Sequence, residues 1–307
     1  MIAQTPPSPE SASVAAERPY YPNTSWRYGL DRLFVIAIWS AIAIAIAALG
    51  LLLFDILLDG LPTLSSQFLQ GFPSRSAERA GVYPALLGTI WVMLVVMFVS
   101  FPLGVGAGIY LEEFAEDNLF TRLVEININN LAGVPSIIYG LLGLFLFVRL
   151  LAPITGGRTV LSGGLTLALL ILPVIIVATR EALRAVPDSL RQGGYALGAT
   201  RWQVIWEQVF PIALPGILTG TILGLSRAIG ETAPLIVVGA VAYISFVPEG
   251  LQSAFTVLPI QIFSWASRPQ QPFHAIAASG IIVLMIVLLL MNGAAIYLRN
   301  RFQKERL

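Results

Sequence analysis

Residues 180–211, REALRAVPDSLRQGGYALGATRWQVIWEQVFP, form the only long polar segment between apolar stretches of this chain. Pro187 followed by Asp188 predicts the start of a short helix. Gly198 and Thr200 predict the end of that helix and the start of a second one, which runs to the closing proline. The pattern therefore indicates two short helices joined at a glycine, exposed on one side of the apolar part of the chain.

The rest of the chain has the composition of a membrane protein. Hydrophobic residues make up 56%, charged residues 11%, and the mean hydropathy is +0.80, values outside the range of soluble domains. Five charge-free windows are long enough for the roughly 20 apolar residues of a spanning helix, and a sixth stretch is interrupted by Arg227 and Glu231. We predict an all-α membrane protein with six transmembrane helices, at about residues 33–57, 83–111, 127–150, 159–180, 212–242 and 274–298.

The distribution of Lys and Arg predicts the orientation. Twelve of the 18 lie in the two tails, in the polar segment and in the loop after the second span, five lie on the other side, and Arg227 is within a span. Both termini and the polar loop at 181–211 are therefore expected to be cytoplasmic. Residues 1–28, rich in Pro, Ser and Ala, are expected to be a disordered tail, residues 29–300 the transmembrane domain, and residues 301–307 a cytoplasmic tail.

Several kinds of chemistry are excluded within this chain. It has no Cys and one His, so a Cys or multi-His metal site and a Cys nucleophile are ruled out. Its only lysine is Lys304, so it contains no G-x-x-x-x-G-K-[ST] phosphate loop. A partner chain must supply any nucleotide hydrolysis. His274 is expected to be an interfacial or packed imidazole rather than a proton relay.

The second helix of the polar loop carries an apolar stripe. Trp202, Ile205, Trp206 and Val209 follow the spacing i, i+3, i+4, i+7. Such a stripe on the cytoplasmic side favours a groove in a partner protein, whereas a hairpin without a partner is the alternative.

The loop resembles the coupling loop, or EAA loop, of ABC importer permeases. The shared pattern is a short helix, a glycine, nine residues, and then hydrophobic-x-hydrophobic-Pro, with Gly198 and Pro211 as the glycine and the proline. The chain departs from the motif at Gln192-Gly193-Gly194, which stands for Glu-Ala-Ala, and at Gln208, which replaces an aliphatic residue.

Four further segments are similar to the PstA family, the permease subunits of bacterial phosphate ABC importers. They are PLGVGAGIYL at 102–111, LAGVPSIIYG at 131–140, RAIGETAP at 227–234 and FTVLPIQIFSWASR at 255–268. The sister permease PstC shares the first three patterns only loosely. The resemblance covers roughly residues 30–300.

This resemblance implies a type I ABC importer (MetI-like) permease fold with cytoplasmic coupling helices, in a bacterial inner membrane. It implies a PstC-like permease as the heterodimer partner, a PstB-like ATPase dimer and a PstS-like phosphate-binding protein, with lipid around the chain and no nucleic acid. The chain itself would bind no cofactor and would not be an enzyme, because the partner ATPase uses ATP and Mg²⁺. The expected ATPase-coupling residues are Gly198, Trp202, Ile205, Trp206 and Pro211.

The charged residues in the fifth span are the candidate substrate pathway. Arg227 and Glu231 are one helical turn apart, so a continuous helix would place them on one face. An Arg near mid-bilayer costs about 2.5–3.5 kcal/mol, and such residues usually face a bundle interior or a water path. A guanidinium suits phosphate, and Glu231 would neutralise Arg227 when the path is empty. We predict Arg227, Glu231 and Thr232 as pathway residues, with a structural ion pair as the alternative.

Other interpretations remain open. The chain could be an ABC importer permease for molybdate or an organic solute, or an ion-driven secondary transporter, or a scaffold without transport activity. Secondary transporters often show an inverted repeat, which we do not detect here. Arg180 and Glu181, at the end of the fourth span, are expected to be interfacial anchors rather than pathway groups.

Overall fold

The computed structural model describes residues 24–241 and 243–304, and these residues form helices and loops without a strand. The chain divides into two units, Met1–Phe54 and Asp55–Leu307. The expected tail at 1–28 lies mostly outside the described residues, but residues 24–28 belong to helix α1 (Thr24–Gly60). At the other end, α13 (Gln271–Lys304) includes residues 301–304 of the expected C-terminal tail.

The described part of the first unit is the N-terminal portion of α1. Large apolar side chains are exposed all along it, Leu33, Ile44 and Leu51 among them. A helix that is apolar on all sides and exceeds 20 residues has the length and surface of a membrane span. It covers the first predicted span and begins before it.

The second unit contains the other long apolar helices. These are α3 (Tyr83–Ile109), α7 (Val160–Arg184), α10 (Phe210–Gly230) and α13. Together with α1 they make five helices in the described residues that are long and apolar enough to cross a membrane, or six if one bent pair counts as a span.

The bent pair replaces the continuous span predicted at 127–150. Helix α4 (Leu119–Leu131) and helix α5 (Ser136–Gly143), which continues through the π-helical turn η5 (Leu144–Leu150), meet at 106°. The bend lies at Pro135, which disfavours helical backbone at the residue before it. The hydroxyl of Tyr139 donates to the carbonyl of Leu131 at 2.8 Å and fixes the bend.

Small residues allow α7 to lie close to α3 on one side and to α10 on the other. A β-carbon added at Gly108 of α3 would lie 2.6 Å from Cβ of Thr179. One added at Gly216 of α10 would lie 2.8 Å from Cβ of Ala182. Such close backbone approach is what small-xxx-small patterns permit in membrane helices. These three helices supply much of the main buried cluster.

The span predicted at 212–242 is also broken. Helix α10 ends at Gly230, Glu231 is extended, and the short helix α11 (Ala233–Val238) ends at Gly239, whose φ is +105°. Helix α11 packs on α5, where a β-carbon at Gly140 would lie 2.7 Å from Cα of Pro234. The two helix breaks of the unit are therefore neighbours.

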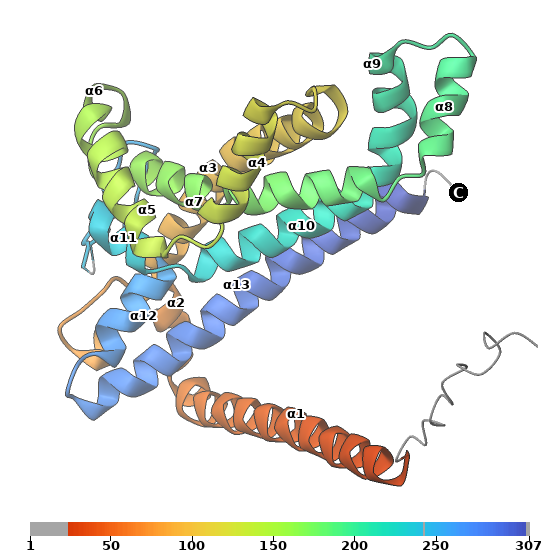
Figure 1. The fold of residues 1–307 in the computed structure, drawn as a ribbon. Helices are drawn as coiled ribbons and strands as arrows, with labels where there is room; N and C mark the ends of the chain where they lie inside the picture. Colours follow the sequence, from red (N-terminus) through yellow and green to blue (C-terminus); the bar gives the residue numbers. More distant parts are fainter. Residues whose placement is uncertain (1–23, 242, 305–307) are drawn as a thin grey trace, which may run out of the picture. The chain divides into compact units, whose positions relative to one another are not determined.

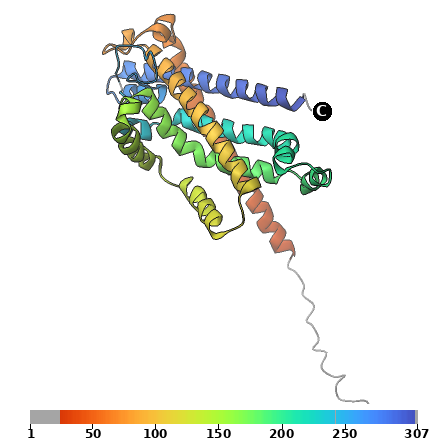
Figure 2. The ribbon, with the colours of Figure 1, turned by 90° about the horizontal axis from the view of Figure 1, so that it is seen from above.

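The remaining helices are short. They are α2 (Ser66–Gln70), α6 (Ala152–Thr155), α8 (Asp188–Ala196), α9 (Arg201–Val204) and α12 (Leu258–Ala266). The backbone N–H of Leu258 at the start of α12 donates to Oγ1 of Thr89 on α3 at 2.9 Å. Helices α8 and α9 form a hairpin beyond the ends of α7 and α10 (Figure 1), and Figure 2 shows the same placement from above.

Candidate functional site

The hairpin has the junction that the sequence predicts. Gly198 has φ +80°, a left-handed conformation that favours glycine. The side chain of Thr200 accepts from the backbone N–H of Gln203 at 3.4 Å, and Oε1 of Gln203 accepts from the backbone N–H of Thr200 at 2.9 Å. This reciprocal capping box fixes the start of α9 directly after the turn.

The second arm of the hairpin is longer than predicted. It does not stop at Pro211: the helix runs from Arg201 to Gly230 as one 30-residue segment. A π-helical turn, η6 (Ile205–Val209), precedes the proline near the start of α10. The second arm of the hairpin is thus continuous with a membrane span.

The predicted single apolar stripe is divided between two faces. Ile205 and Val209 are fully buried inside this chain, whereas the side chains of Trp202 and Trp206 are 59% and 52% exposed. The prediction that all four face a partner is wrong, because Ile205 and Val209 face the chain's own interior. The two exposed indoles stack at 5.7 Å, and Trp206 stacks on Phe210 at 5.0 Å. The exposed aromatic face that could meet a partner therefore centres on Trp202 and Trp206.

The tip of the hairpin carries a residue that the stripe pattern missed. Leu197, directly before the left-handed Gly198, is 87% exposed, and Tyr195 is exposed beside it. The two side chains add apolar surface at the tip of the hairpin. The sequence does contain a signal for this exposed residue, namely a large apolar residue directly before the glycine of the turn.

The candidate pathway residues lie at the end of α10. Nε of Arg227 is 3.4 Å from Oε1 of Glu231, so the two charges form an ion pair. They do not share one continuous helix as predicted, since Glu231 follows the last residue of α10. The side chain of Arg227 is 50% exposed and that of Glu231 18% exposed. Thr232 comes next, at the start of α11. The pair therefore occupies a helix break, and half of the guanidinium is accessible.

Arg180 is not the interfacial anchor that was expected. It is buried, its Nε donates to Glu112 at 3.1 Å, and its Nη2 donates to Glu125 at 2.6 Å. Arg184 donates to both oxygens of Glu112. The expected anchor Glu181 remains exposed, 3.8 Å from Arg184. An ion-pair network thus joins the end of α7 to the segment after α3.

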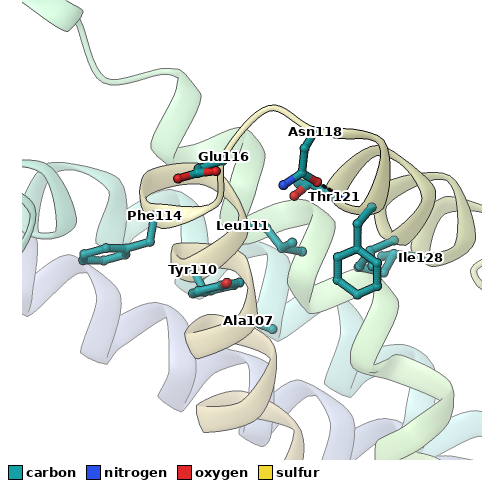
Figure 3. Close-up of a pocket in the computed structure, with 10 residues that line it drawn as sticks. Ala107, Tyr110, Leu111, Phe114, Glu116, Asn118, Thr121 and Ile128 are labelled. Atoms are coloured by element: carbon teal, nitrogen blue, oxygen red, sulfur yellow. Dashed lines mark hydrogen bonds between the residues drawn. The ribbon is translucent and has the colours of Figure 1, made fainter.

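A cavity of about 470 Å³ opens beside this network, between the end of α3 and α4 (Figure 3). In the figure Tyr110, Leu111 and Phe114 line one side and Ile128 the other, with Glu116 at the rim. The lining includes no Arg or Lys. This cavity therefore offers no cation to an anionic substrate.

The long apolar helices and the capped hairpin beyond the ends of α7 and α10 describe a multi-pass membrane protein. The chain matches the family "Binding-protein-dependent transport system inner membrane component" over residues 100–304. It belongs to this family. The predicted ABC importer permease fold is confirmed. Membership of this family implies that the chain acts together with an ATPase and a substrate-binding protein.

Relatives and solved structures agree with this assignment. The chain is 32% identical over 277 residues to the probable ABC transporter permease protein YqgI of Bacillus subtilis, covering 86% of this chain and 93% of that protein. It is 30% identical over 282 residues to the phosphate transport system permease protein PstA of Haemophilus influenzae, covering 92% and 96%.

Among solved structures, a chain of the bacterial alginate ABC transporter in complex with its periplasmic protein superposes with a TM-score of 0.65 at 17% identity, covering 90% of this chain and 96% of that one. The MetNI methionine ABC transporter gives 0.55 at 20% identity, covering 71% and 94%. At these identities the structures establish the fold alone.

Proposed function

We propose that this chain is the permease subunit of an ATP-driven importer of inorganic phosphate. The observation that carries the proposal is the similarity to relatives named as phosphate transport permeases, which extends over 92% of the chain. The chain would form the translocation path with a second, PstC-like permease and receive substrate from a PstS-like phosphate-binding protein. It is a transport subunit and not an enzyme.

A PstB-like ATPase dimer would supply the energy, with ATP and Mg²⁺ bound by that partner. The hairpin supports this role, because its exposed tip at Leu197 and its exposed indoles at Trp202 and Trp206 offer apolar surface to a groove. Closure of the ATPase dimer on ATP would push the hairpin. Since α9 continues into α10, the push would reach the break after Gly230 along one helix.

Arg227, Glu231 and Thr232 would line the phosphate path. The half-exposed guanidinium can present a planar pair of donors to a phosphate oxyanion. Glu231 would hold Arg227 when the path is empty and accept a hydrogen bond from protonated phosphate when it is filled. The helix break supports this role, because irregular backbone at membrane depth is tolerated where it lines a cavity or is buried in protein.

We further propose that the chain lies in a bacterial inner membrane with both termini and the hairpin in the cytoplasm. The excess of Arg on the hairpin side supports this orientation.

A permease for another substrate, such as molybdate or an organic solute, is the alternative within the same family. The name of the relative YqgI states no substrate, which leaves this alternative in place. An ion-driven secondary transporter is disfavoured by the family assignment.

The test is uptake by the complete complex in proteoliposomes, with ATP inside and the binding protein outside. We expect accumulation of labelled phosphate that stops without ATP, survives proton and sodium ionophores, and resists competition by molybdate. Accumulation that ionophores abolish, or that molybdate but not phosphate competes, would overturn the proposed substrate or energy source.

A further inference from the structure

Two consecutive carboxylates at the end of α3 bind two different helices. Glu112 and Glu113 lie in the π-helical turn η4 (Tyr110–Phe114). Glu112 accepts from Arg180 and Arg184 on α7, whereas Glu113 accepts from Arg191 on α8, 78 residues away in the sequence. The π turn therefore connects the end of one span to both a second span and the first helix of the hairpin.

Arg191 uses every donor of its guanidinium. Nη2 donates to Oε1 of Glu113 at 2.7 Å and Nε to Oε2 at 3.4 Å. The other donors bind the carbonyls of Val186 at 2.8 Å and Leu183 at 2.9 Å and the carboxylate of Asp188 at 3.1 Å. A guanidinium has five N–H donors, and five bonds are present. No lysine can reproduce this set.

The pair is shielded from water on both sides. The side chain of Arg191 is 15% exposed and that of Glu113 6% exposed, although most of α8 is exposed. In the described part of the chain, the carboxylate of Glu113 accepts hydrogen bonds from Arg191 alone. The hydrogen bond to Glu113 raises the pKa of the Arg191 guanidinium, so the group remains charged. Loss of Arg191 would leave the charge of Glu113 buried and unpaired, whereas loss of Glu113 would leave Arg191 paired only with the exposed carboxylate of Asp188.

We propose that the Arg191–Glu113 pair is the joint that transmits movement of helix α8 to the cytoplasmic end of α3, which makes both side chains positioning residues for the coupling of ATP hydrolysis to transport. The inference rests on the proposed function, because it requires that the hairpin is moved by an ATPase. The second arm of the hairpin already leads into α10. With the pair intact, the first arm also moves α3, so two spans respond to one push.

The connection between residues 113 and 191 can be removed and then restored in the same variant by a chemical cross-link. This is possible because the chain has no native cysteine. Glu113→Cys with Arg191→Cys is assembled with cysteine-free partners and reconstituted, and a reversible bis-thiosulfonate reagent bridges the two thiols. The ratio of ATP hydrolysed to phosphate moved is then measured. We expect this ratio to rise at least about tenfold without the bridge, to return toward the unmodified value with the bridge, and to rise again after reduction. An unchanged ratio without the bridge, or a bridge that restores nothing, would overturn the proposal.

A second variant covers the case in which the double cysteine chain does not assemble. Arg191→Lys keeps the charge but loses the planar fork. It should yield an assembled complex with a raised ratio of ATP to phosphate. Failure of both variants to assemble would also contradict the proposal, since the pair would then be a requirement of folding rather than of coupling.

Glu181→Gln is the matched control. It removes an exposed carboxylate from the same cytoplasmic region, 3.8 Å from Arg184 and outside the joint, and should leave the ratio unchanged. Phosphate uptake by the unmodified complex is measured first. If that complex does not move phosphate, the proposed substrate fails, and the joint is then tested by whether the binding protein still stimulates ATP hydrolysis in each variant.

Discussion

Gly194 on α8 and Gln208 on the second arm face each other across the hairpin that α8 and α9 form. A β-carbon added at Gly194 would lie 3.1 Å from Oε1 of Gln208 and 2.7 Å from Cγ2 of Val204. These are two of the positions at which the loop departs from the usual coupling motif, where an alanine and an aliphatic residue are common. The missing methyl group on α8 therefore leaves room for the second arm, for the side chain of Val204 as well as for the amide of Gln208.

Gly194→Ala should loosen the hairpin. The added methyl group cannot fit without displacing Val204, and overpacking of this kind typically costs about 1–3 kcal/mol. We expect faster proteolysis within residues 185–210 and weaker binding of the ATPase. Gly193→Ala is the control, because nothing lies within 4 Å of its added methyl group and alanine favours helix over glycine by roughly 0.5–1 kcal/mol. Equal proteolysis rates for the two variants would refute the packing explanation.

Leu197→Asp at the tip of the hairpin should release the ATPase. A carboxylate in an apolar groove is left desolvated and unpaired, so we expect affinity to fall by at least about tenfold in a pull-down. Trp202→Glu with Trp206→Glu should act in the same direction. Leu119→Asp at the start of α4 is a matched control, since this leucine is similarly exposed. ATPase binding that survives both hairpin variants would remove the docking assignment.

Labelling of introduced cysteines tests the orientation in the membrane. Ser245 and Ser189 are both exposed and belong to opposite predicted sides of the chain. An impermeant thiol reagent added outside intact cells should modify Ser245→Cys directly, and Ser189→Cys only after the cytoplasm is opened. The reverse pattern would invert the proposed topology.

The helices, the capped turn and the charge pair could be predicted from the sequence, because each depends on local chemistry. The residues around Gly198 and Thr200 determine their own turn, and the apolar windows determine their own helices. The ion pairs that the sequence did not predict depend on contacts between residues that lie far apart in the chain. The pairing of Arg180 with Glu112 and of Arg191 with Glu113 joins residues 68 and 78 positions apart and requires the packing of α7 against α3. The bend before α5, in contrast, has a local cause in Pro135 that the sequence does contain. A run of carboxylates directly after a span, opposite a loop rich in Arg, was the available clue.

Arg227→Lys should separate charge from geometry at the helix break. Lysine keeps the positive charge but has no planar fork for parallel bonds to phosphate. We expect phosphate uptake to fall at least about tenfold, the equivalent of one good charge-assisted hydrogen bond, while the complex still assembles. Unchanged uptake would mean that a point charge is sufficient at this position.

The most direct test of the proposed phosphate path is phosphate uptake by the double variant Arg227→Met, Glu231→Leu in the complete complex. Removing one charge alone leaves the other unpaired at the helix break, whereas removing both leaves no unpaired charge. We expect a complex that assembles, hydrolyses ATP and does not move phosphate, because the oxyanion has lost its partner in the path. Near-normal phosphate uptake by the assembled double variant would show that neither side chain meets the substrate.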